Sequence, residues 1–447
     1  MENKMVSLDA VMLFILVVGR VAVNCLLDVA MPRPWALIEK IPLIGTLLSP
    51  HGVELLSPGR TDPISLLLVS VAFLLLLIYL LLDVMGVSSY RTKLGITLLL
   101  VFFTVIANSL FAVMLRRVGD PWEYAHDGGV LQTEEAIRHM LAGKNPYIEN
   151  YMGSSLMQLR GPNHFSIFHY PYFPLTFVFP IPSYLLSQRL IGWFDQRFVY
   201  LPLFFLTLLL LQGFASDKTG KLLLVMIAGF NPTMGSDLIL GMNDSFVFFW
   251  IVLSLYLLLN ERGTLSAIAL GLACASKATA WFLVPFWLLY LCRGHCLSWK
   301  ATSRCLKLSI PFLLTLLLFL LPFFLWDWQA MMDDIWSSNV GTVPHSFPIT
   351  GWGFANFVLG LGWVKTRMAY FPFWIPELIV CLPLLAYFLR RQARENTIQS
   401  MLIGYSFFLF AFFYFSRFLH GNYMGYILVL FALAYFSERR PSPSEDQ

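Results

Sequence analysis

The segment GDPWEYAHDGG brings four titratable side chains together just before a pair of glycines, namely Asp120, Glu123, His126 and Asp127. A carboxylate beside glycines, which let a substrate approach the main chain closely, is typical of a general base that accepts a proton from a hydroxyl group. Asp127 is our first candidate for such a base, and Asp120 is the second. The simpler interpretation is that Asp127 caps a turn or helix and that Asp120-Pro121 begins a loop.

Cationic side chains that could bind a phosphate group occur elsewhere in the sequence. Lys277 lies in CASKATA between two apolar segments, where a charge is costly unless it faces a cavity or a partner. Arg417 and His420 in FSRFLHGNYM combine a bidentate cation with a titratable imidazole, and Arg160 in QLRGPNH is a weaker candidate. Alternatively, Lys277 extends along apolar surface to reach water, and Arg417 is an ordinary interfacial arginine.

Two further positions could support this chemistry. Asn243-Asp244 precedes an apolar run, which is a common start of a helix, and the pair could also orient Lys277. His345 lies in GTVPHSFPITGWGF, whose glycine, proline and aromatic residues suit a sugar-binding wall or a lid. His345 could relay the proton from Asp127, or it could be an ordinary loop histidine.

The composition indicates which elements must position these residues. Of 447 residues, 58% are hydrophobic, 16% are aromatic and only 13% are charged, and the mean hydropathy is +0.70. These values are typical of membrane proteins, and apolar runs long enough to cross about 30 Å of hydrocarbon recur along the chain. We expect an all-α polytopic protein in which residues 1–447 form one integral membrane domain. The net charge of +4 is spread over loops and indicates orientation in the membrane rather than nucleic-acid binding.

The apolar runs predict about twelve transmembrane helices. The loops that carry Lys or Arg should be cytoplasmic, which places both termini and the tail 438–447 in the cytoplasm. The first run lacks a convincing cleavage site, so we interpret it as a helix and not as a signal peptide. The predicted spans are 6–29, 63–84, 94–115, 198–215, 221–236, 244–260, 264–276, 278–292, 308–325, 371–389, 398–415 and 421–437.

Three long segments are then expected on the extracytoplasmic side, at residues 30–62, 116–197 and 326–370. The stretch 165–197 contains several prolines and must cross the membrane either twice or not at all. We therefore expect it to form a re-entrant or interfacial hairpin of broken helices. The first catalytic loop would be 116–197, and 326–370 would be the second large loop.

The sequence GVLQTEEAIRHMLAGKNPY, residues 129–147, predicts a short amphipathic helix at the membrane surface. Its apolar stripe would consist of Ile137, Met140 and Leu141, which are spaced at three and four residues. Gly143, followed by an Asn-Pro pair, should end the helix.

The polar residues of this helix have two possible uses. Asp127 or Thr133 could cap its start. Glu134 and Glu135 could fix the helix by pairing, which we favour, or they could contact hydroxyl groups of an acceptor. Two nearby tyrosines are expected to pack the loop, with stacking on a sugar as the alternative: Tyr147 and Tyr170.

The cysteines do not predict a metal site. Cys292 and Cys296, with His295 between them, have ligand-like spacing, but no second pair of ligands follows. We therefore expect free thiols beside a membrane surface and no bound metal.

Several of these segments together resemble GT-C-type membrane glycosyltransferases that use polyprenyl-phosphate sugars, most closely the mannosyltransferase-like branch. The features are HDGG, then GKNPY and HYPYFPL, and then GMNDSFVFFW followed by a helical hairpin with Lys277 at its tip. They extend over roughly residues 115–290, and their order and spacing carry the resemblance. It implies that an aspartate of the first extracytoplasmic loop is the general base, which by position is Asp127.

The chemistry that the resemblance implies is the transfer of a hexose, mannose being favoured, from a polyprenyl- or dolichyl-phosphate to a hydroxyl group. Such a transfer needs a base and a cationic site for the departing phosphate, but no metal or other cofactor. No Asp-x-Asp motif occurs, which agrees with a lipid-linked donor. A single displacement implies inversion at the anomeric carbon. The acceptor would be a glycolipid, a glycan or a protein, on the outer face of a bacterial or archaeal plasma membrane.

A secondary transporter or lipid flippase is the alternative class, because it would also have about twelve spans and broken helices. We find no repeat between the two halves of the sequence, and the unusual charges gather in the segments expected outside. Both features favour the enzyme. A structural role in a membrane assembly is a third class, but it gives no reason for the acid-bearing loop.

Overall fold

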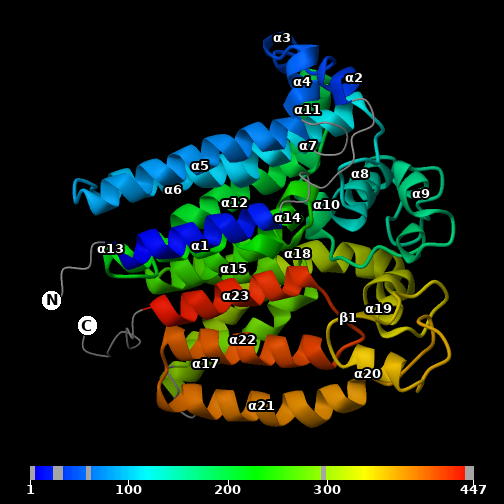
Figure 1. The fold of residues 1–447 in the computed structure, drawn as a ribbon. Helices are drawn as coiled ribbons and strands as arrows, with labels where there is room; N and C mark the ends of the chain where they lie inside the picture. Colours follow the sequence, from blue (N-terminus) through cyan, green and yellow to red (C-terminus); the bar gives the residue numbers. More distant parts are fainter. Residues whose placement is uncertain (1–5, 24–33, 57–61, 293–298, 438–447) are drawn as a thin grey trace. The chain divides into compact units, whose positions relative to one another are not determined.

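The computed structural model describes residues 6–23, 34–56, 62–292 and 299–437. Nearly all of the regular structure in these residues is helical (Figure 1), as expected for an all-α chain. By the density of its contacts the chain divides into two compact units, which we describe separately. The first unit comprises residues 1–131 and 195–243, and the second comprises residues 132–194 and 244–447. The expectation of one membrane domain stays a prediction.

Long apolar helices dominate the first unit, in which α1 packs against α5 and α13, and α6 packs beside α5 (Figure 1). The 22 residues of α5 extend about 33 Å, which is enough to cross the hydrocarbon of a bilayer. The helices of this unit are α1 (Leu8–Ala22), α2 (Pro34–Ile38), α3 (Ile44–Leu47), α4 (Pro50–Leu56), α5 (Pro63–Val84), α6 (Tyr90–Val101), α7 (Ala107–Val118), α12 (Arg197–Leu211), α13 (Lys218–Gly229) and α14 (Pro232–Leu240).

Local sequence explains how α5 begins and how α6 continues into α7. Asp62 caps α5 by accepting the main-chain N–H of Ile64 at 3.0 Å. Between α6 and α7 lies a π-helical turn, η1 (Phe102–Ile106), so that one apolar element runs from Tyr90 to Val118. Asn108 donates to the carbonyl of Phe103 at 2.9 Å. The carbonyl of Phe103 is therefore hydrogen-bonded within the protein and does not need a water molecule as its partner.

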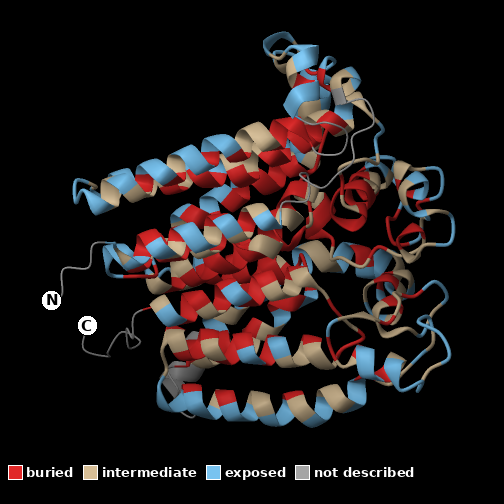
Figure 2. Cartoon of the chain, viewed as in Figure 1, coloured by how far each residue is buried: buried red, intermediate tan, exposed pale blue. Residues whose placement is uncertain are grey.

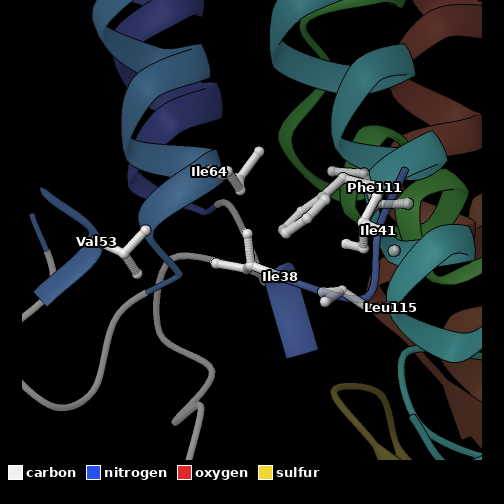
Figure 3. Packing of buried hydrophobic residues seen from close by; sticks show 8 residues of the cluster. Ile38, Ile41, Val53, Ile64, Phe111 and Leu115 are labelled. Carbon is white, nitrogen blue, oxygen red and sulfur yellow. The ribbon is translucent and has the colours of Figure 1, made fainter. Parts of the chain in front are cut away.

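Residues 34–56 fold back onto the ends of α5 and α7 instead of forming an extended loop. A buried apolar cluster joins the short helices to the long ones (Figure 3), and its labelled members are Ile38, Ile41, Val53, Ile64, Phe111 and Leu115. This packing orders the described part of the segment 30–62.

The second unit contains a hairpin of α15 and α16 that packs on α18, and an antiparallel row of α21, α22 and α23 (Figure 1). Two short strands, β1 (Thr350–Gly351) and β2 (Phe418–Leu419), pair in parallel. The remaining elements are α8 (Thr133–Leu141), α9 (Ser155–Arg160), η3 (Phe165–Ile167), α10 (Leu175–Val178), α11 (Ile181–Ile191), α15 (Asp244–Leu259), α16 (Gly263–Cys274), η4 (Ala278–Leu283), α17 (Val284–Leu291), α18 (Trp299–Met332), η5 (Asp333–Ser337), α19 (Ser338–Val340), α20 (Ala355–Gly360), α21 (Trp374–Arg394), α22 (Ile398–Phe415) and α23 (Gly421–Phe436).

Among the described residues, four helices are long and apolar enough to cross a membrane, or five if the bent pair α13 and α14 is one span. That pair bends by 49° because Pro232 cannot donate within a helix and Asn231 caps α14 instead. The predicted span 221–236 is therefore interrupted by a bend, and its crossing of the membrane stays a prediction. Several other expected spans are apolar helices of 10–17 residues, so the count of twelve stays a prediction.

The long helices carry many exposed residues (Figure 2), and on α5 and α18 these include large apolar ones. Leu74 and Leu77 of α5 are 57% and 53% exposed, and Leu318 of α18 is 68% exposed. Such surfaces are unfavourable in water and favourable in lipid, so these helices indicate association with a membrane.

The proline-rich stretch 165–197 forms short helices, as its composition predicts. Helix α11 has 11 residues and begins at Ile181, directly after its N-cap Pro180, and the helix before it, α10, has four residues. Neither helix is long enough to cross a bilayer alone. Leu186 and Leu190 of α11 are exposed, as expected of a broken helix in contact with lipid.

Candidate functional site

The carboxylate of Asp127 is held by its own segment within the first unit. Its Oδ1 accepts the main-chain N–H of Gly128 at 2.8 Å and lies 3.2 Å from Nε2 of His126. Nδ1 of the same imidazole accepts the N–H of Gly129 at 3.0 Å. Because Nδ1 is an acceptor, the neutral ring carries its proton on Nε2, facing the carboxylate. Asp127 is thus a buried and oriented carboxylate.

Asp120, the second candidate base, lies in a different environment. It is exposed at the start of the loop, and its charge raises the pKa of the neighbouring Glu123 carboxyl, in addition to the larger effect of burial. A base must hold one geometry relative to its substrate, so the buried carboxylate of Asp127 suits the task better.

Neither Asp127 nor Thr133 caps α8, so that expectation is wrong. Asp127 begins a π-helical turn, η2 (Asp127–Gln132), that continues directly into α8, and Gln132 occupies the cap position in a helical conformation. The helix ends where predicted, since Gly143 has a φ of 74°, which suits glycine after a C-terminus.

The buried face of α8 differs from the predicted stripe. Ile137 is buried, but Leu141 is 46% exposed, and Thr133 and Glu134 are buried instead. Thr133 is buried because this side of α8 packs against Tyr170, and the hydroxyls of the two residues lie 3.2 Å apart. The favoured pairing role of the acidic residues agrees with the salt bridge between Arg138 and Glu135; Glu134 is 4.0 Å from Arg138.

Lys277 and Asp244 form the principal charged pair of the second unit. Nζ of Lys277 lies 2.7 Å from Oδ1 of Asp244. Oδ2 of the same carboxylate accepts a hydrogen bond from Nδ2 of Asn422 at 2.8 Å. The rings of Tyr172 and Tyr423 flank the ammonium group, with centroids at 5.7 and 5.3 Å. The expected contact of Lys277 with the Asn-Asp pair is therefore confirmed for Asp244.

The main chain explains why these groups meet. Lys277 lies between α16 and η4 at the tip of a hairpin, as predicted, in an extended conformation. Asp244 opens α15, also as predicted, and Asn243 precedes it as a buried residue. Helices α15 and α16 pack together, which brings the first residue of one to the end of the other.

A second charged pair of this unit, His169 with Asp334, was missed by the sequence analysis. Nδ1 of His169 lies 2.8 Å from Oδ1 of Asp334, and its Nε2 lies 2.7 Å from the carbonyl oxygen of Pro344. Both ring nitrogens face acceptors, so the imidazolium form is favoured. Burial lowers the pKa of His169, but these hydrogen bonds and the negative charges of Asp334 and Asp333 together outweigh burial, and the pKa lies above its ordinary value.

Tyr170 and Tyr147 pack the loop, as we expected. The main-chain N–H of Tyr170 donates to Oδ2 of Asp334 at 2.8 Å, and the hydroxyl of Tyr147 donates to the carbonyl of Tyr172 at 2.8 Å. The HYPYFPL sequence thus supplies His169 and Tyr170, which bind Asp334, and Tyr172, whose ring flanks Lys277.

Arg417 lies among main-chain carbonyls, and its assignment to a phosphate site stays a prediction that these contacts do not favour. Its guanidinium is buried and donates to main-chain carbonyls, including those of Phe347 at 2.6 Å and Ala369 at 3.0 Å. Burial lowers the pKa of Arg417 to about 10. The side chain ties the segment 340–369 to β2, because a buried guanidinium has enough donors to organise several carbonyls.

The other candidates lie in less constrained surroundings. His345 is exposed, has a φ of 54° and stacks on Phe168 with ring centroids 3.8 Å apart. His420 precedes α23 beside Phe418, and Arg160 is exposed at the end of α9. Nothing in these contacts assigns a chemical role to them.

No group of three His, Cys, Asp or Glu side chains that could hold a metal ion occurs in the part of the chain that the structure describes. Cys292 is buried, whereas His295 and Cys296 lie outside the described residues, as does the tail 438–447.

Comparison with known proteins adds no assignment: no family model matches the chain, and no curated protein sequence matches it. The likeness to GT-C enzymes therefore depends on the segments quoted above.

The hydrogen bonds of His169 predict that the segment 340–346 is stabilised in a pH-dependent manner. The raised pKa of His169 means that its contribution is lost as the pH rises through that pKa, and because burial raises the pKa of Asp334 to about 6, the ion pair is complete only above about pH 6. Amide hydrogen exchange in 340–346, corrected for intrinsic rates, should therefore accelerate at alkaline pH. His169→Gln should abolish this pH dependence, and His345→Gln should keep it. An unchanged pH response in His169→Gln would contradict the assignment.

Proposed function

We propose that the chain is a glycosyltransferase that moves a hexose, mannose being favoured, from a polyprenyl-phosphate sugar to an acceptor hydroxyl on the extracytoplasmic face. Asp127 would be the general base, and Lys277 would contact the phosphate of the donor. The observation that carries this proposal is the environment of Asp127, a buried carboxylate oriented by a main-chain N–H and by His126. The quoted likeness to GT-C enzymes assigns the same residue.

The reaction would be a single displacement. The acceptor oxygen loses its proton to the Asp127 carboxylate and forms a bond to the anomeric carbon as the bond from that carbon to the phosphate oxygen breaks. The electron pair of the broken bond leaves with the polyprenyl phosphate. An ionised carboxylate is required at the start, and Nε2 of His126 lies 3.2 Å from Oδ1 of Asp127, where it can orient that oxygen.

The Lys277 site suits a leaving phosphate because its ammonium is already held in place. Asp244 fixes the ammonium from one side, and Tyr172 and Tyr423 flank it. A cation that is oriented before the reaction stabilises developing negative charge without the cost of reorganisation. Asp244, Asn422 and the two tyrosines would thus position the donor-binding residue.

Membrane insertion is part of the proposal, since a polyprenyl donor is itself confined to a bilayer. The exposed leucines of α5 and α18 support contact with lipid. We propose about twelve spans with both termini in the cytoplasm of a bacterium or archaeon, on the basis of the positively charged loops. The acceptor would be a glycolipid, a glycan or a protein.

The base assignment predicts a large loss of transfer in Asp127→Asn. The amide cannot accept the acceptor proton, so transfer from a panel of radiolabelled polyprenyl-phosphate sugars should fall by about 10²-fold or more. The matched control is Asp120→Asn, which removes an exposed carboxylate of the same loop and should change the rate by no more than about twofold.

Each outcome of this assay has a different meaning. Transfer that survives in Asp127→Asn but not in Asp120→Asn would move the base to Asp120. Wild-type protein that transfers no sugar from any donor, with a full acceptor extract present, would refute the proposed activity. A lipid-flipping assay in vesicles would then test the transporter alternative.

If Lys277 contacts the phosphate of the donor, Lys277→Met should lower both stability and transfer, and a second substitution should separate the two effects. The single change leaves the buried Asp244 carboxylate without its cation, so the protein should lose stability by about 3–5 kcal/mol and also lose transfer. The double variant Lys277→Met/Asp244→Asn removes both charges. It should recover most of the melting temperature in detergent, while transfer stays at least about tenfold below wild type because phosphate stabilisation is still missing.

Recovery of transfer together with stability in this double variant would contradict a role for Lys277 at the phosphate. It would indicate that the pair serves only to hold α15 and α16 together.

A further inference from the structure

A buried ion cluster of the first unit lies beside the segment that carries Asp127. The carboxylate of Asp195 is paired in bidentate fashion with Arg197, with Oδ1 to Nε and Oδ2 to Nη2 both 2.8 Å. Nη1 of Arg116 lies 2.8 Å from the same Oδ2. All of these groups are buried or nearly so. Although burial alone would raise the pKa of Asp195, the two arginines lower it well below its ordinary value.

Other donors of these arginines reach the main chain of residues 120–131 and of Ile239. Nη1 of Arg197 donates to the carbonyl of Tyr124 at 2.7 Å and to that of Ile239 at 2.8 Å. Nε of Arg116 donates to the carbonyl of Pro121 at 2.7 Å. The cluster thus fixes the main chain before Asp127 to α7, α12 and the end of α14.

The conformation of this segment requires such support. Tyr124 has a φ of 54°, which is unfavourable for a residue with a side chain and persists only when the surroundings hold it. The carbonyl of Tyr124 is the one that Arg197 binds. The ion cluster therefore compensates for local strain three residues before Asp127.

The main chain after Asp127 is held by a second contact from the same helix. The hydroxyl of Tyr200, one turn after Arg197 on α12, donates to the carbonyl of Gly129 at 2.8 Å. Gly129 also lies directly on Gly241, since a Cβ built on Gly129 would come within 2.1 Å of the Gly241 carbonyl oxygen. The N–H of His126 donates to the carbonyl of Leu240 at 2.7 Å.

We infer that Asp195, Arg197 and Tyr200 are positioning residues that hold the main chain on both sides of Asp127 and so orient its carboxylate. This inference rests on the proposed function, in which Asp127 is the base. In the hydrogen bonds given above, these residues bind the protein main chain, Arg116 and one another, so they would affect catalysis through geometry. A displacement of about 1 Å at a reacting group can lower a rate substantially, by about 10²-fold.

Tyr200→Phe tests this inference without breaking the ion cluster, which could prevent folding. The matched control is Tyr79→Phe, because Tyr79 is also a buried phenol of the first unit, and its hydroxyl donates to Asp9, far from 120–131 in the sequence. Hydrogen exchange in residues 121–131 should be about fivefold faster in Tyr200→Phe, as expected for one lost hydrogen bond, and unchanged in Tyr79→Phe.

Kinetics then test whether the positioning acts through Asp127. In Tyr200→Phe, kcat should fall about tenfold while the KM for the donor stays within about twofold. In the Asp127→Asn variant, adding Tyr200→Phe should not lower the residual kcat any further. A multiplicative loss in that background would overturn the inference.

The exchange experiment does not depend on enzymatic activity. Faster exchange confined to 121–131, in a protein that transfers no sugar, would keep Tyr200 as the support of this segment and refute the proposed function. Exchange in 121–131 that equals wild type, or that rises equally throughout the first unit, would refute the positioning role whatever the kinetics show.

Discussion

Burying a charge away from water is costly unless an opposite charge or several aligned dipoles compensate for it. This constraint determines where the polar side chains of both units lie. Asp195 is paired with Arg197 and Arg116 in the first unit, and Asp244 with Lys277 in the second. In each case the pair does more than neutralise charge. It brings the ends of helices together and fixes main-chain segments that carry the candidate site.

The same constraint accounts for Arg417, which is buried but donates to carbonyls of the segment 340–369. A guanidinium can be satisfied by carbonyl dipoles because it has five donors in a plane. An arginine that uses its donors in this way organises a segment and is poorly suited to exchange partners with a phosphate group during each turnover. Lys277 instead has an ammonium held by one carboxylate and two aromatic rings, and the residue is 9% exposed against 2% for Arg417.

The fold class and part of the candidate site could be predicted because they follow from local sequence. Apolar runs predicted helices, and the cost of a charge in CASKATA indicated that Lys277 needs a partner, which Asp244 provides. Interactions between distant residues left no local signal: His169 and Asp334 are 165 residues apart. The stripe predicted for α8 failed at Leu141 because its buried face is set by Tyr170, which periodicity alone does not reveal. The bend at Pro232 was missed because the apolar run continues across it.

The central claim is that a carboxylate at Asp127 activates a hydroxyl for one direct displacement at the anomeric carbon. The most direct measurement is the anomeric configuration of the product, determined by NMR after transfer from a polyprenyl-phosphate sugar of known β-configuration. Direct displacement predicts an α-linked product. A β-linked product would contradict the account, because retention requires a second displacement and a covalent intermediate on a nucleophile that we have not assigned.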